Sequence, residues 1–82
     1  MKKQVEIRIS ILEMTIEDLK RREQEEVERI RSYAADANAY SIVEFLPGYI
    51  KELAETRRKI AELDEQKRML VWMLAQAEKD NA

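Results

Sequence analysis

The sequence predicts an all-α protein: an antiparallel helical hairpin with coiled-coil-like packing that pairs with a second copy into a dimeric four-helix bundle. Two observations favour this fold class. Only one glycine and one proline occur in 82 residues, which is typical of long helices rather than of sheets or disordered tails. Apolar residues also recur at alternating intervals of four and three before and after the Pro-Gly pair, as they do along the seam between packed helices.

The length predicts a single helical-hairpin domain that covers residues 1–82. A chain of 82 residues is near the size at which one core provides only a few kcal/mol of stability. We therefore expect a partner to add to the stability of this fold.

The first helix is predicted from about residue 3. Its seam consists of apolar residues at heptad spacing: Val5, Ile9, Leu12, Ile16 and Leu19. Glu23 and Glu26 occupy the next two seam positions. Apolar residues then resume one residue out of phase, at Val27, Ile30, Ala34 and Ala37. A shift of this kind predicts a local change in supercoiling.

The N-terminal residues also fit a strand. "VEIRISI" alternates apolar and polar residues, and its apolar residues are β-branched, which is typical of a half-buried strand. Thr15 would then cap a helix that begins there. Helix is the preferred interpretation of residues 4–12, and strand is the alternative.

The chain is expected to reverse once, between residues 35 and 49. The first choice is "LPG" at residues 46–48, because Pro47 cannot donate to the carbonyl of Val43 and Gly48 accepts a left-handed conformation. The second choice is "ADANAY" at residues 35–40, where Ser41 and Glu44 form a capping box for the following helix. In that case Pro47 lies near the beginning of the second helix.

The second helix carries the clearest seam and the candidate interaction site. The seam comprises Leu53, Ile60, Leu63, Leu70, Leu74 and Ala77, with Thr56 and Lys67 as polar interruptions. Around two of these seam residues, the run "MLVWMLA" at residues 69–75 is apolar on almost the full circumference of the helix. A corner at Pro47 places this run opposite the polar residues 20–26, and a corner near residue 38 places it opposite residues 1–7.

Neither corner covers the run, so we predict that it forms a protein interface. The predicted interface residues are Met69, Leu70, Val71, Trp72, Met73 and Leu74. Trp and Met are frequent in interfaces, as an anchor and as adaptable contacts respectively. We expect a homodimer, since two-fold symmetric pairs are the commonest oligomers, with a second protein as the alternative partner.

The residue inventory argues against an enzyme. The chain has no histidine and no cysteine, so the usual general base, metal ligand and strongest nucleophile are missing. We predict no catalytic residue, no cofactor-binding residue and no metal ligand. The one carboxylate pair worth weighing, Glu23 and Glu26, is interpreted as a solvated polar gap.

Charge and hydropathy bear on partners and location. Fifteen basic residues stand against seventeen acidic ones, for a net charge of −2, which argues against nucleic acid as the partner. The longest apolar run has seven residues, too few for a membrane helix. We expect no membrane association and a cytoplasmic location.

The predicted function is a small non-enzymatic protein–protein interaction module: an adaptor, a chaperone or an inhibitor that acts through an apolar helix surface. Two resemblances supply alternatives. "AYSIVEFLPGYIKELAETRRKIAEL" resembles the second arm of the flagellar export coiled-coil stalk protein, and the hairpin is similar in shape to small type III secretion chaperones. This implies a secretion-associated chaperone or an export-stalk-like protein.

The second resemblance concerns residues 2–19, which resemble ribbon–helix–helix DNA-binding proteins. It implies that residues 4–12 form a strand and that Glu6, Arg8 and Ser10 face the major groove. The chain departs from that family in its longer following helix, in its acidic balance and in the placement of Glu6 toward DNA.

Overall fold

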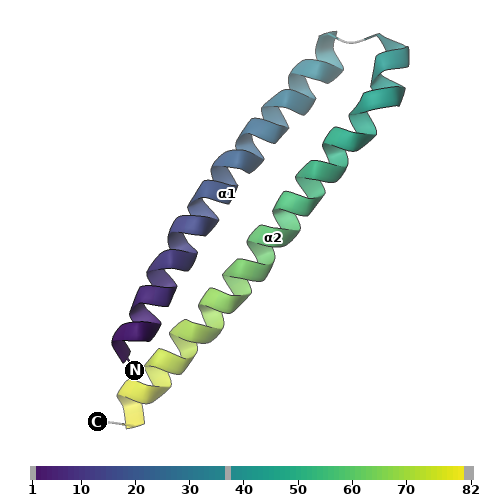
Figure 1. The fold of residues 1–82 in the computed structure, drawn as a ribbon. Coiled ribbons are helices and arrows are strands. Elements are labelled where there is room, and N and C mark those ends of the chain that lie inside the picture. Colours follow the sequence, from purple (N-terminus) through teal and green to yellow (C-terminus); the bar gives the residue numbers. More distant parts are fainter. Residues whose placement is uncertain (1, 37, 81–82) are drawn as a thin grey trace.

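The protein is a hairpin of two long antiparallel helices (Figure 1). The computed structural model describes residues 2–36 and 38–80: α1 spans Lys2–Asp36 and α2 spans Ala39–Asp80. The hairpin measures 64 × 15 × 14 Å. We call the end where the two termini lie side by side the open end, and the opposite end the corner end. The predicted antiparallel helical hairpin is confirmed, whereas its pairing into a dimeric bundle remains a prediction.

The corner lies between Asp36 and Ala39. The first choice for the corner, residues 46–48, is therefore wrong, and the position of the second choice, residues 35–40, is confirmed. Asn38 begins α2, because its Oδ1 accepts a hydrogen bond from the Ser41 N–H at 2.9 Å. Its carbonyl also accepts from the Ile42 N–H at 3.0 Å. This is the geometry of an N-cap. Asn38 therefore caps α2 in place of the Ser41–Glu44 capping box that the sequence predicts.

Pro47 is accommodated inside α2, and Gly48 has no positive φ. Proline in a helix leaves the carbonyl four residues earlier without its N–H donor, which here is the carbonyl of Val43. Both Val43 and Pro47 lie on the exposed side of α2. Water can therefore reach this part of the backbone, and the helix continues through the proline.

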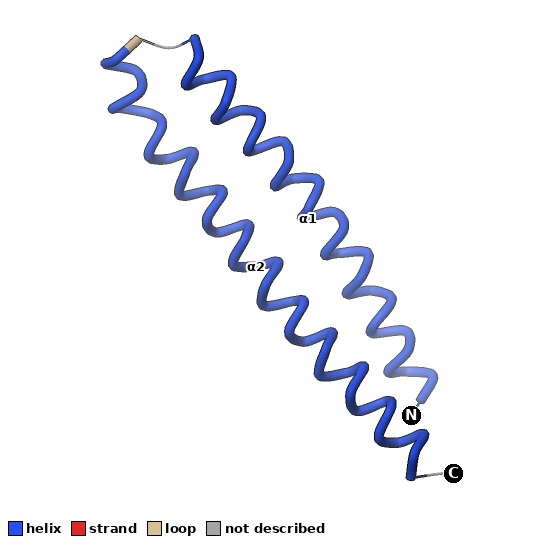
Figure 2. The backbone as a smooth tube through the Cα atoms, turned by 180° about the vertical axis from the view of Figure 1, so that it is seen from behind, coloured by secondary structure: helices blue, strands red, loops and turns tan. Residues whose placement is uncertain are grey.

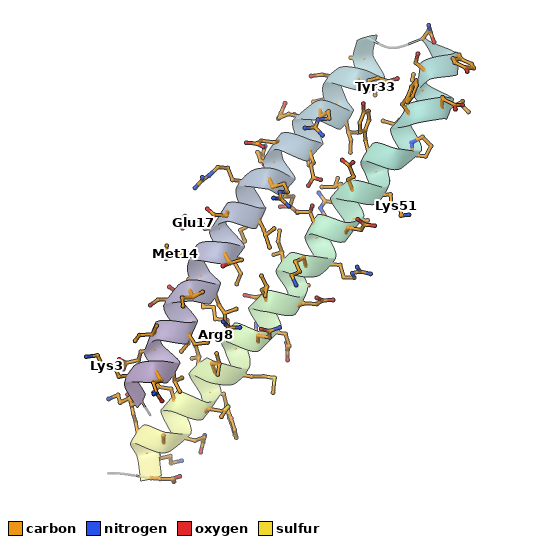
Figure 3. The ribbon with its side chains drawn as sticks, in the orientation of Figure 1. Lys3, Arg8, Met14, Glu17, Tyr33 and Lys51 are labelled. Carbon is orange, nitrogen blue, oxygen red and sulfur yellow. The ribbon has the colours of Figure 1, made fainter. Side chains whose placement is uncertain are left out.

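Tyr33 holds the start of α2 against α1. Its hydroxyl donates to the Ser41 carbonyl at 3.0 Å, and its ring meets Tyr49 edge-on, with ring centroids 5.3 Å apart. Figure 3 shows Tyr33 between the two helices near the corner end. An aromatic pair of this kind contributes about 0.5–1.5 kcal/mol, so contacts on both sides of Pro47 keep this part of α2 in place.

The strand alternative for residues 4–12 is wrong, because these residues lie within α1. Thr15 is not a cap: its hydroxyl donates to the Ile11 carbonyl at 2.9 Å, four residues back in the same helix. A single strand would leave its backbone groups unpaired, whereas the helix satisfies them and packs Val5, Ile9 and Leu12 toward α2. The ribbon–helix–helix interpretation therefore loses the strand that it requires.

The seam is continuous along both helices, and the predicted phase shift in α1 is wrong. After Leu19, the side chains of Glu23, Glu26, Ile30 and Tyr33 continue the same heptad and are buried or half-buried. Of the residues predicted out of phase, Val27 is half-buried beside the seam, Ala34 is exposed, and Ala37 lies outside the described residues. In α2 the seam runs from Leu53 to Leu74 as predicted, through Thr56 and Lys67. It also extends back to Ile42, which was not predicted, while Ala77 is exposed.

The apolar core is small. Leu12, Ile16 and Leu63 are its buried residues, and Leu19, Ile60 and Leu70 pack against them. The accessible surface is 6585 Å², against about 5,100 Å² for a compact protein of this mass. Two helices alone therefore leave an excess of roughly 1,500 Å² exposed.

Ion pairs join the two helices in one register along the whole hairpin. Figure 2 shows the same two helices from behind. The pairs are Lys2–Glu78 at 3.0 Å, Glu13–Lys67 at 3.5 Å, Glu23–Arg57 at 2.9 Å and Arg29–Glu52 at 3.8 Å. This register places residues 69–75 opposite the first turns of α1, at the open end.

Candidate protein interface

The apolar run at residues 69–75 is divided between the seam and the surface. Leu70 packs against the core cluster, and Leu74 is half-buried in the same seam. These two members of the predicted interface therefore contribute to the fold of the hairpin itself. This contribution is larger than the sequence predicts, because Val5 and Ile9 lie opposite them in the observed register.

The other predicted interface residues are exposed at the open end. Met69 is 58%, Trp72 64% and Met73 51% exposed, and Val71 is exposed as well. Met69, Trp72 and Met73 line an apolar hollow on the surface of α2, together with Glu65 and Arg68. A surface with this many large apolar side chains is typical of a binding site.

A second exposed apolar stripe lies on α1 and was not predicted. It consists of Ile7, Ile11 and Met14, whose spacing of four and three places them along one side of the helix. Figure 3 shows Met14 pointing away from α2. The alternation in "VEIRISI" contained this signal, since its odd-numbered residues supply both the seam and the exposed stripe once the segment is read as a helix.

Exposed apolar side chains also occur near the corner end of α2: Tyr40, Val43, Phe45 and Ile50. They are separated from the open end by a charged stretch. One side of that stretch carries a shallow groove, whose rim is formed by Arg22, Glu25, Arg29, Glu52, Glu55 and Lys59. The middle of the hairpin is therefore polar on the surface, and apolar side chains gather toward both ends.

The floor of the groove includes a polar layer of the seam. Glu26 and Thr56 are buried, at 8% and 7% exposure, and both line the groove. Glu23 pairs with Arg57 at 2.9 Å, whereas Oε1 of Glu26 is buried and has no hydrogen-bond partner among the described residues. We call Glu23, Glu26 and Thr56 the middle layer. The interpretation of Glu26 as a solvated side chain is wrong.

Metal-binding groups and membrane-spanning helices are absent from the described part of the chain. Residues 2–36 and 38–80 hold no group of three or more carboxylates arranged to bind a metal ion. Within the same ranges, neither helix is long and apolar enough to cross a membrane.

Comparison with known proteins adds no assignment. No protein-family model matches the chain, and no match is found among curated proteins or among solved structures. The exposed apolar side chains and the small core beneath them are therefore the features that bear on function.

Proposed function

We propose that the protein is a non-enzymatic protein–protein interaction module that acts through the exposed apolar side chains at its open end. The observation that carries this proposal is the exposure of Met69, Trp72 and Met73 beside one another on α2. Trp is among the residues that contribute most to binding energy, and Met adapts to the shape of a partner. A module of this kind works as an adaptor, a chaperone or an inhibitor in the cytoplasm.

A second copy of the chain is the first partner that we propose. The hairpin exposes roughly 1,500 Å² more than a compact protein of its mass, and a standard interface takes about 800 Å² from each partner. A two-fold pair of hairpins, packed as a four-helix bundle, would remove much of this excess from water.

A different protein is the second candidate partner. A secretion-associated chaperone or stalk-like protein is the alternative function, and α2, which begins at Ala39, is the helix that carries the resembling segment. In that case the same apolar side chains bind another chain.

Sedimentation equilibrium at several concentrations tests the proposal. We expect a dimer at micromolar concentration, and a monomer when Trp72→Gln and Met73→Gln are combined, because both side chains are exposed in the hairpin and neither belongs to its seam. The matched control combines Tyr40→Gln with Val43→Gln, at positions that are as exposed on the same helix. It should remain a dimer.

Two outcomes contradict this proposal in different ways. A wild-type monomer at every concentration, with Trp72 fluorescence typical of an exposed indole, excludes the second copy and leaves a different protein as the partner. A double variant that still dimerises excludes the open end of α2 as the contact.

A further inference from the structure

The two broad sides of the hairpin differ at the open end. The side that carries the charged groove, which we call the groove face, is defined in the middle of the hairpin by Arg22 and Glu25 on α1 and by Glu52, Glu55 and Lys59 on α2. In packed helices of this type, residues seven positions apart return to the same face. The groove face can therefore be followed toward the open end from the sequence.

At the open end the groove face carries three exposed apolar side chains beside two polar ones, because the residues two heptads from Arg22 and Glu52 are Arg8 and Gln66. Ile11 lies two heptads before Glu25 in α1, and Met69 lies two heptads after Glu55 in α2. Two heptads from Lys59 is Met73. All three side chains are exposed, and Trp72 adjoins Met69 and Met73 in the apolar hollow of α2.

The opposite broad side is charged in the turns next to this region, toward the middle of the hairpin. A groove there is lined by Glu13, Glu17 and Lys20 of α1 and by Asp64 and Lys67 of α2. Removing these charges from water without partners would be unfavourable. The groove face is therefore the better of the two broad sides for apolar contact at the open end.

Resting on the proposed self-association, we infer that two copies pair through the open ends of their groove faces and run in opposite directions. Each copy places Ile11, Met69 and Met73 against the same residues of the other, with Trp72 at the edge of the contact. A contact of a surface with itself about a two-fold axis closes at two copies. The occupant of this surface is thus a second copy of the chain.

The charged middle of the groove face determines how the two copies run relative to each other. Any overlap along the full length, parallel or antiparallel, would cover the rim residues Arg22, Glu25, Arg29, Glu52, Glu55 and Lys59 with another charged surface. An antiparallel overlap limited to the open ends leaves these side chains in water. The four-helix bundle is then confined to the open ends, the corner ends project away from each other, and the dimer is longer than the 64 Å hairpin.

Small-angle X-ray scattering of the wild-type dimer and single-cysteine cross-linking test this arrangement. With the contact centred near Ile11 and a rise of 1.5 Å per residue, the dimer should be about 100 Å long. The chain has no cysteine, so a disulfide in Met69→Cys can form only between the introduced cysteines of two copies. Under mild oxidation it should form a disulfide-linked dimer at least about tenfold faster than Val43→Cys, because pairing raises the effective concentration.

The outcomes separate this inference from the proposed function. A dimer close to 64 Å long, or equal cross-linking of the two variants, overturns the open-end arrangement and leaves self-association standing. Rapid cross-linking between Met73→Cys and Phe45→Cys chains would likewise overturn it, since that contact requires full-length antiparallel overlap. A wild-type monomer overturns self-association, and this arrangement with it.

Discussion

The open half of the hairpin and its middle fill the same seam with different side chains. Toward the open end the seam holds Leu12, Ile16 and Leu63, and exposed apolar side chains such as Met69, Trp72 and Met73 lie near it on the surface. In the middle the seam holds Glu23, Glu26 and Thr56, and the surface around it is charged. The open half therefore supplies the core and the candidate interface, whereas the middle layer supplies polar contacts that favour one register of the helices over others.

The largest difference should appear when the seam is truncated in each region. Leu63→Ala should lower the free energy of unfolding by about 2–5 kcal/mol, because it empties the centre of the apolar core. Thr56→Ala is the matched change in the middle layer and should lower it by about 1 kcal/mol, because it removes one buried methyl group. Urea unfolding followed by circular dichroism measures both. Equal losses would show that the core is not concentrated in the open half.

Replacing the buried carboxylate should have the opposite sign. Glu26→Leu removes an oxygen that is buried without a hydrogen-bond partner and adds apolar contact in the seam. We expect it to raise the free energy of unfolding by about 1–3 kcal/mol. Thermal unfolding should show this as a higher Tm.

Glu25→Leu is the control for Glu26→Leu, since Glu25 is the exposed neighbour and its replacement should change little. A Tm for Glu26→Leu that is equal to or below that of wild type would contradict the account. That result would mean that the Glu26 carboxylate makes a favourable contact in solution.

The ion pair between Glu23 and Arg57 should contribute less. Its N–O distance is 2.9 Å, but the Arg57 side chain is 59% exposed, so water screens the attraction. A double-mutant cycle with Glu23→Gln and Arg57→Gln should give a coupling energy of about 0.2–1 kcal/mol. The longer Arg58–Glu62 pair, at 3.9 Å, serves as the comparison. A larger coupling for that pair would remove the special role of the middle layer in fixing the register.

The smallest effect should come from Lys2 at the open end. The hydrogen bond from its ammonium group to Glu78, and the charge of that carboxylate, raise the pKa of Lys2 above its ordinary value. Stability from this pair is therefore fully present below the pKa of lysine in the unfolded chain and is lost as the pH rises through the higher pKa in the fold. Tm measured against alkaline pH should fall slightly more for wild type than for Lys2→Gln. Parallel curves would show that the pair is unimportant.

Periodicity in the sequence was enough to predict the hairpin and most of the seam. The heptad spacing from Val5 to Leu19 and from Leu53 to Leu74 reflects burial against one partner helix, and that signal is local. The phase of the seam beyond Leu19 was predicted wrongly. Glu was assumed to face water, although the seam can hold it where a cation such as Arg57 lies across the helix pair.

The position of the corner was harder to predict, because Pro47 is a strong local signal and Asn38 a weak one. The cap at Asn38 and the contacts of Tyr33 with Ser41 and Tyr49 favour the earlier corner, and these contacts depend on tertiary structure. The same limit applies to the interface. Met69, Trp72 and Met73 are exposed, and the interface that the sequence predicts there stays a prediction. The half-buried positions of Leu70 and Leu74 and the exposed stripe with Ile11 depend on the register of the helices.

The Tm of the wild-type protein at two concentrations tests directly whether association at the open end completes this fold. If folding and association are linked, a hundredfold increase in concentration should stabilise the folded dimer by about 2.7 kcal/mol and raise the Tm measured by circular dichroism. The Trp72→Gln, Met73→Gln variant should lose this dependence. A wild-type Tm that is the same at both concentrations would contradict the claim and show that the hairpin is stable as a single chain.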